Sequence, residues 1–343
     1  MTPREIILQA FEGGKPERVP VSLFGAGMWS IKSFESSFEE LSTDAAKMSD
    51  MLVTLSDKLL CDIVYAGSGY NNFHAAAFGG EIKFRSMGAP DLKEHLVSSV
   101  EDIEKFDLSA LDNEATLNIV KDALHRTREQ IGDKYVVSMT AWGPFTLGAR
   151  FVGEETMMKA TFKNPDLVHR VTDFATDLLI HLYEPLVDDG TLEVISLADP
   201  TASGDLISRK QFEKFAVPYL KKFTDWARSK KAYTLLHICG NTTDRLDVMP
   251  GTGASCISLD HKTDIGKAYE ALHGRICFAG NVDPVGVMLQ GSVDDVERAC
   301  REVIERAGTE GGFVLMPGCD IPPTVPYENI RKFIQVAREW KLT

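Results

Sequence analysis

The chain has 343 residues, of which 44% are hydrophobic and 25% charged, so it is long enough to bury a large core. Its formal net charge of −13, with a pI near 5.1, excludes a general nucleic-acid or anionic-membrane surface, because both require clustered Lys and Arg. Residues 1–14 lack a basic segment followed by an apolar one, and no apolar run approaches the roughly 18 residues of a membrane span. We therefore expect a cytoplasmic protein with no nucleic acid partner and no membrane partner.

Short apolar, β-branched runs alternate with long amphipathic segments along the chain. The runs predict eight strands, at 19–24, 62–67, 135–140, 193–199, 233–239, 256–260, 275–281 and 313–318. After a helical lead-in at 1–14, the segments between the strands predict helices that include 43–60, 114–131, 164–187, 209–229, 265–273 and 293–307. Eight strand–helix units predict an α/β fold, a (β/α)8 TIM barrel forming one domain over 1–343. A doubly wound open sheet is the alternative, but no dinucleotide glycine fingerprint supports it.

One connection, residues 70–112 after the second strand, is too long for an ordinary βα loop. It is predicted to be an insertion with structure of its own, including a hairpin around 78–86 (FGGEIKFRS). We expect this insertion to lie over the barrel mouth.

Polar side chains follow several of the predicted strands and should meet at one rim of the barrel. They are His237 and Cys239 after the fifth strand, Asp260 and His261 after the sixth, Asn281 and Asp283 after the seventh, and Cys319 after the eighth. Barrel enzymes place their active sites at this carboxyl-terminal face, where several strands contribute groups to one point.

Three of these residues predict a metal site. Residues two apart in a strand point to the same side, so His237 and Cys239 can bind one ion, and Cys319 can reach it across the mouth. An imidazole with two thiolates is a ligand set that zinc prefers, and three protein ligands leave a fourth position for chemistry. A single His or Cys is more often structural, but the H-x-C spacing with a later Pro-Gly-Cys turn indicates a site.

Weaker expectations concern three polar residues near the same rim. Asp199, Asn281 and Asp283 are predicted to bind polar groups of a substrate or to orient metal-binding histidines. The alternative is that they cap helices or brace turns.

Four segments carry a resemblance to a known family. The segments HICGN, SLDHKTDIGKA, FAGNVDPVGVML and VLMPGCDIPPTVPYENI resemble, in order and spacing, the methylcobamide:coenzyme M methyltransferases within the uroporphyrinogen decarboxylase superfamily. RVPVSLF and LADPTASGDLIS fit the superfamily too, so the resemblance spans most of the chain. It implies a (β/α)8 barrel with a catalytic zinc on the matching residues His237, Cys239 and Cys319.

The resemblance also separates two branches of the superfamily. The decarboxylase branch carries an arginine-bearing R-Q-A-G-R segment after the first strand, whereas residues 24–30 here read FGAGMWS without an arginine. Decarboxylases also lack the zinc triad. The methyltransferase branch is therefore favoured over tetrapyrrole decarboxylation.

One position departs from the methyltransferase pattern. Members of that branch often have an acidic residue directly after the aspartate that ends the sixth strand, and here His261 stands there. Imidazole is a competent zinc ligand, so we expect His261 either to occupy the fourth position at rest or to hydrogen-bond outside the ligand shell.

The resemblance implies methyl transfer between a methyl-corrinoid and a zinc-activated small thiol such as coenzyme M or homocysteine. The chain lacks a corrinoid-binding D-x-H-x-x-G signature, so we expect the co-substrate to come from a corrinoid protein or as free methylcobalamin. Two alternatives stay open, which are demethylation of a methylated substrate onto cobalt(I) and a corrinoid-binding protein with structural zinc.

Overall fold

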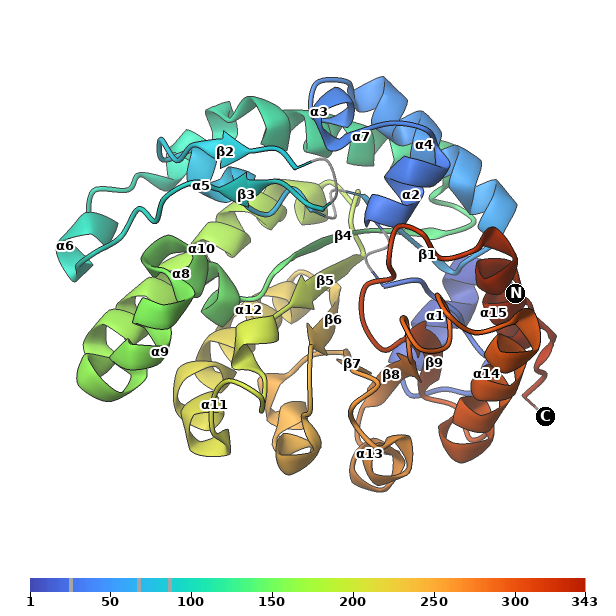
Figure 1. The fold of residues 1–343 in the computed structure, drawn as a ribbon. Coiled ribbons are helices and arrows are strands. Elements are labelled where there is room, and N and C mark those ends of the chain that lie inside the picture. Colours follow the sequence, from blue (N-terminus) through green and yellow to red (C-terminus); the bar gives the residue numbers. More distant parts are fainter. Residues whose placement is uncertain (25–26, 67–68, 86–87, 343) are drawn as a thin grey trace.

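The computed structural model describes residues 1–24, 27–66, 69–85 and 88–342. Its centre is one curled sheet of seven parallel strands, which Figure 1 shows surrounded by helices. The strands are β1 (Ile63–Ala66), β4 (Val136–Trp142), β5 (Val194–Ala198), β6 (Tyr233–Ile238), β7 (Cys256–Leu259), β8 (Cys277–Val282) and β9 (Phe313–Pro317). Their order in the sheet follows the chain without reversal, which contradicts the doubly wound alternative.

The first predicted strand, 19–24, is the part of the barrel prediction that was wrong. Instead of a full strand, Val21 makes a single parallel bridge to Leu315 on β9. On the other side, the Asp62 N–H donates to the Val21 carbonyl at 2.9 Å. Pro20 has no N–H to donate, which limits a regular ladder here. The segment therefore joins the edge strands β1 and β9, and the fold is a barrel-like curled sheet of seven strands.

Helices cover the outside of the sheet (Figure 1). The longer outer helices are α4 (Ala45–Leu59), α7 (Ala115–Ile131), α8 (Pro144–Val152), α9 (Glu154–Lys163), α10 (Pro165–Asp188), α11 (Arg209–Phe215), α12 (Val217–Ser229), α13 (Ile265–Leu272), α14 (Val293–Ala307) and α15 (Tyr327–Glu339), with the short α2 (Gly27–Ser33) and α3 (Phe38–Leu41) near the N-terminus. The first helix, α1 (Pro3–Phe11), packs instead against the inward-facing side chains of the sheet. Within the described residues, no helix has both the length and the apolar character that crossing a membrane requires.

Apart from 19–24, the predicted strands agree with the described ones to within two residues at each end, whereas one predicted helix is divided. The helix predicted at 209–229 is two helices, α11 and α12, with Pro218 in the first turn of α12, where a missing N–H costs no helix hydrogen bond. The strand predicted at 62–67 is β1, and its predicted last residue, Gly67, lies outside the described residues.

The connection between β1 and α7 contains several short elements. They are α5 (Phe73–Ala76), β2 (Ile82–Lys83), β3 (Asp91–Leu92), α6 (Val100–Ile103) and a 3-10 helix at Leu108–Asn113. Strands β2 and β3 pair antiparallel, Ile82 with Leu92, while Ser86 of the predicted hairpin lies outside the described residues. The N–H groups of Leu96 and Val97 donate to the Phe151 carbonyl at 3.0 Å, which fixes this connection to α8.

Side chains of the sheet alternate between two cores. Inward-facing residues such as Ile63, Val136 and Val194 form one cluster with α1, inside the curled sheet. The residues between them, such as Val137 and Ile195, pack outward against the helices in a second cluster. Because both faces are buried, the strands read as nearly continuous apolar runs. The few polar side chains on the inner face are consequently the ones that matter for a site.

Candidate metal centre

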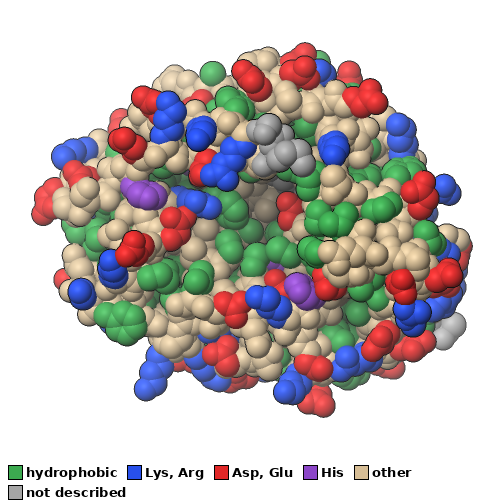
Figure 2. Space-filling view, viewed as in Figure 1, with side chains coloured by type: hydrophobic (Ala, Val, Ile, Leu, Met, Phe, Trp, Pro, Cys, Tyr) green, Lys and Arg blue, Asp and Glu red, His purple; other side chains and the backbone are tan. Residues whose placement is uncertain are grey.

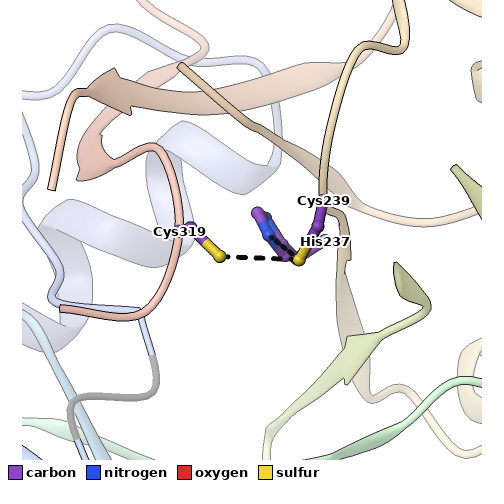
Figure 3. Close-up of side chains that lie close together, drawn as sticks. All are labelled: His237, Cys239 and Cys319. Carbon is purple, nitrogen blue, oxygen red and sulfur yellow. Dashed lines mark hydrogen bonds between the residues drawn. The ribbon is translucent and has the colours of Figure 1, made fainter. Parts of the chain in front are cut away.

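His237, Cys239 and Cys319 come together at the carboxyl ends of the strands (Figure 3). His237 lies near the end of β6, Cys239 directly follows that strand, and Cys319 is two residues beyond β9. The His237 Nε2 lies 3.2 Å from the Cys239 Sγ, and the two Sγ atoms are 3.5 Å apart. His237 is fully buried, whereas both cysteines are partly accessible. Three donor atoms thus converge from two segments eighty residues apart.

The donor set fits zinc in chemistry and in spacing. Tetrahedral zinc with Zn–S bonds of about 2.3 Å and a Zn–N bond of about 2.0 Å separates two sulfurs by roughly 3.8 Å, and a sulfur from a nitrogen by roughly 3.5 Å. The observed separations of 3.5 and 3.2 Å are a few tenths of an ångström smaller. Among the described residues, this is also the one group of three or more His, Cys, Asp or Glu side chains close enough to hold an ion.

The His237 ring is held from two sides. Its Nδ1 lies 3.0 Å from the Ser258 Oγ, because Ser258 on β7 pairs in register with His237. The Phe24 ring lies 4.5 Å from the imidazole, centroid to centroid. A hydrogen bond at Nδ1 leaves Nε2 directed at the sulfurs, which is the orientation that a metal ligand needs. Ser258 was not among the predicted site residues, although its position two residues before Asp260 puts it on the same strand face.

Asp260 is not part of the three-residue ligand group, and it connects the loops around the site through hydrogen bonds. Its Oδ2 accepts the Gly240 N–H at 2.8 Å, and its Oδ1 accepts the Lys262 N–H at 2.9 Å. His261 places its Nδ1 3.0 Å from the same Oδ1. The structure thus leaves His261 outside the three-residue group and partly exposed.

A close backbone approach positions Cys319. The Gly318 N–H donates to the Val282 carbonyl at 2.8 Å. A Cβ atom at Gly318 would lie 2.3 Å from the His261 backbone nitrogen, so this approach requires glycine. The loops after β7 and β9 therefore touch directly in front of Cys319.

The two thiols of the site affect each other's ionisation. The hydrogen bond from Cys239 lowers the pKa of Cys319. The same contact, together with burial, raises the pKa of Cys239. The two thiols therefore titrate as one coupled pair and not as two independent groups.

The predicted substrate-binding residues make structural contacts. Asp199 is fully buried, and its Oδ1 accepts the Thr146 N–H at 2.7 Å, which caps α8. Asn281 donates to the carbonyls of Asp260 and Thr263, and the Asp283 Oδ1 accepts two N–H groups of its own turn. These contacts are those of caps and braces, and a role in substrate binding stays a prediction.

The face that carries the site is hollowed at its centre. Figure 2 shows hydrophobic side chains within this hollow and charged side chains of both signs around it.

A curled parallel sheet with three convergent His and Cys ligands at the ends of its strands defines a barrel-like α/β protein with a candidate metal centre. The family model for uroporphyrinogen decarboxylase (URO-D) matches residues 2–340, and the chain belongs to this family. The resemblance found in the sequence is thereby confirmed.

Relatives within the family include both branches. The chain is 30% identical to the methylcobamide:CoM methyltransferase of Methanosarcina acetivorans, over 99% of this chain and 98% of that protein. It is 27% identical to the uroporphyrinogen decarboxylase of Myxococcus xanthus, over 67% of this chain and 66% of that protein. A solved structure of a methyltransferase from Methanosarcina mazei superposes with a TM-score of 0.88 at 26% identity, covering 99% of both chains.

Proposed function

We propose that this protein is a zinc-dependent methyltransferase that moves a methyl group between a methyl-corrinoid and a small thiol. The observation that carries the proposal is the convergence of the His237 Nε2 with two Sγ atoms at the end of the sheet. The 30% identity to a methylcobamide:CoM methyltransferase over nearly the whole of both chains supports it.

His237, Cys239 and Cys319 would hold the zinc. Bound there, zinc would act as a Lewis acid that lowers the pKa of a coordinated thiol, so that the acceptor is a thiolate at neutral pH. The thiolate sulfur forms a bond to the methyl carbon as the cobalt–carbon bond breaks, and the electron pair of that bond stays on cobalt. Sulfur, carbon and cobalt must be nearly in line, so the protein has to position its substrates accurately.

The surrounding residues supply that positioning. Ser258 fixes the imidazole through Nδ1, and Phe24 packs against the ring. Asp260 ties the loop after β6 to the loop after β7 through its bonds to Gly240 and Lys262. His261 is proposed either as a fourth, displaceable ligand or as an outer group, and its contact with Asp260 supports the outer role.

The methyl-corrinoid is proposed to arrive on a separate corrinoid protein or as free methylcobalamin. The proposed acceptors are coenzyme M, homocysteine or another small thiol, and the reverse transfer onto cobalt(I) uses the same site. The net charge of −13 supports a protein that works in the cytoplasm without nucleic acid or membrane partners. The proposed unit is a single domain over 1–343.

Two other functions have less support. Tetrapyrrole decarboxylation is supported by the similarity to a uroporphyrinogen decarboxylase. However, the arginine-bearing segment of the decarboxylases is replaced here by FGAGMWS, and decarboxylation does not require the His237, Cys239 and Cys319 triad. A corrinoid-binding protein with structural zinc would be expected to have four protein ligands, whereas three converge among the described residues.

Zinc content and methyl transfer test the proposal together. Wild-type protein should contain about one zinc per chain and demethylate methylcobalamin in the presence of a thiol, followed by absorbance. Cys239→Ser and Cys319→Ser should lose both properties. Cys300→Ser, which changes a buried thiol on α14, is the matched control and should keep both. Freshly purified, reduced wild-type protein without zinc would overturn the proposal.

A further inference from the structure

A cleft of about 480 Å³ lies at the amino ends of the strands, away from the metal centre. Tyr233 and Cys277, the first residues of β6 and β8, line it together with Ser255, which directly precedes β7. The end of α1, at Phe11, closes another part of the wall. Sites for small molecules usually have volumes of about 300–1,000 Å³. The cleft is therefore large enough for a small ligand of its own.

Arg228 contributes one positive charge to the wall of this cleft. Its guanidinium donates to the Gly253 carbonyl at 2.6 Å and to the Asp225 carboxylate at 3.1 Å. That carboxylate also accepts a hydrogen bond from Lys221 at 2.6 Å, so it is shared between two cations. The two bonds of Arg228 leave further N–H donors of the guanidinium for another acceptor.

Arg275 contributes a second positive charge to the same wall. It donates to the backbone carbonyls of Ala271 and Asp247, at 3.1 and 3.4 Å. The Asp247 carboxylate pairs with Arg209, and the pKa of Asp247 is lowered by that bond first and by the charge of Arg275 at longer range. Among the described residues, the Arg275 guanidinium has no ion-pair partner of its own.

The remaining titratable side chains of the wall do not cancel these two charges. His273 stacks on Tyr269 with ring centroids 4.6 Å apart, and in the described part of the chain its ring nitrogens make no hydrogen bond. Glu12 is the one acidic residue among those that line the cleft, and its carboxylate accepts the Tyr233 hydroxyl. A protein of net charge −13 thus has a cleft with a local excess of positive charge.

Aromatic and apolar groups lie in the same cleft. The rings of Phe11 and Tyr233 meet edge to face, with their centroids 6.1 Å apart. Ile276 and Cys277 add apolar surface at the start of β8. An apolar wall with a few polar groups is typical of sites for small organic ligands. The ligand that fits this lining has an apolar body and an anionic end.

We propose that the cleft binds a small phosphate ester with an aromatic body. Arg228 and Arg275 would hold the phosphate, and Tyr233 would pack against the body. Phosphate is favoured over carboxylate because it carries more negative charge and more acceptor oxygens, which two guanidinium groups can bind together. The inference is independent of methyl transfer, because the metal ligands lie at the other ends of the strands.

The test measures the binding of four probes to freshly purified protein by calorimetry near neutral pH. The probes are phenyl phosphate, inorganic phosphate, benzoate and phenol, which separate the contributions of the anion and of the ring. The variants are Arg228→Gln and Arg275→Gln. Arg301→Gln is the matched control, because Arg301 is a half-exposed arginine of α14 outside the cleft. Cys319→Ser reports any binding of phosphate at the metal centre.

We expect wild-type protein to bind phenyl phosphate with a Kd of about 1 mM or lower, and the other three probes more weakly. Each of Arg228→Gln and Arg275→Gln should weaken that binding about 10- to 100-fold, the range for a hydrogen bond to a charged group. Arg301→Gln and Cys319→Ser should bind as wild type does. Tyr233→Leu should reduce the preference for phenyl phosphate over inorganic phosphate, because it removes the ring.

Absence of saturable phenyl phosphate binding to wild-type protein would overturn the inference. So would binding that both cleft variants retain, or binding that Cys319→Ser abolishes, since the latter places the ligand at the metal centre. If an arginine variant does not fold, the four probes on wild-type protein decide. Tightest binding of phenyl phosphate would support the inference, and equal binding of benzoate or phenol would overturn it.

Discussion

Arg18 and Asp62 form a buried, two-pronged ion pair that closes the curled sheet. The guanidinium nitrogens lie 2.9 and 2.5 Å from the two carboxylate oxygens, and both side chains are almost inaccessible. Asp62 also accepts the Val21 N–H at 2.7 Å. The segment that joins the edge strands is therefore held by side-chain chemistry where the regular ladder is missing.

Removal of one partner of this ion pair should strongly lower the free energy of unfolding. Asp62→Ala leaves the Arg18 charge buried and unpaired, so we expect a loss of about 3–5 kcal/mol in the free energy of unfolding, measured in urea. The double variant Arg18→Met/Asp62→Leu should recover much of that loss, because it leaves no charge behind. A single variant as stable as wild type would show that the pair does not hold the segment.

Ser258 should matter for metal binding through His237. Ser258→Ala removes the hydrogen bond to Nδ1 at 3.0 Å, and losses of about 10- to 100-fold in metal affinity are typical for such outer partners. Competition with a chromophoric chelator measures the affinity, and Ser138→Ala supplies a buried serine away from the ligands. An unchanged affinity in Ser258→Ala would mean that the ring is oriented without this bond.

His74 should make the protein acid-sensitive. It is fully buried on α5, neither ring nitrogen has a partner in the described structure, and burial, helped by Lys121, lowers its pKa to about 4. The unfolded chain binds a proton near pH 6.5, whereas the folded chain does not until about pH 4. Stability is therefore fully present above pH 6.5 and is lost as the pH falls towards 4.

The size of this effect follows from the pKa difference. Between pH 7.5 and pH 5, His74 should account for a loss of about 2 kcal/mol in the free energy of unfolding. His74→Leu should show a correspondingly smaller loss in urea titrations at the two pH values. His125→Gln, at a half-exposed histidine, serves as the control. If His74→Leu and wild type lose stability in parallel, the buried imidazole is not the cause.

Gly318→Ala should disturb the metal centre without touching a ligand. The added Cβ would lie 2.3 Å from the His261 nitrogen, so the two loops must separate, at a cost of about 1–3 kcal/mol. We expect weaker zinc retention on dialysis against a chelator. Gly251→Ala, where a Cβ meets nothing within 4 Å, should retain zinc as wild type does.

The sequence predicted the parts of the site that depend on short-range geometry. The period of two along a strand was enough to place His237 and Cys239 on one side, and the last strand brought in Cys319. The hydrogen-bond partners of these ligands depend on how neighbouring strands align with each other, and the sequence does not specify that alignment. Ser258 reaches His237 because the two pair across strands, and no spacing along the chain indicates that.

The closing segment shows a similar limit in the fold prediction. The apolar run at 19–24 reads as a strand, and the run is buried in the structure. Whether it forms a full ladder depends on Pro20 and on the separation of β1 and β9, which only the folded sheet determines. The break between α11 and α12 had a local signal in Pro218, but a long amphipathic pattern across it favoured one helix.

The separation of the three ligands along the chain determines the order in which they become available during synthesis of the protein. A growing chain contains His237 and Cys239 long before Cys319 emerges, and Cys319 reaches them only after β9 has docked between β8 and the segment at Val21. Until then the chain can offer a metal one imidazole and one thiolate. The metal can therefore be bound by all three ligands only late in folding. Retention of the metal consequently reports whether β9 has docked beside the segment at Val21.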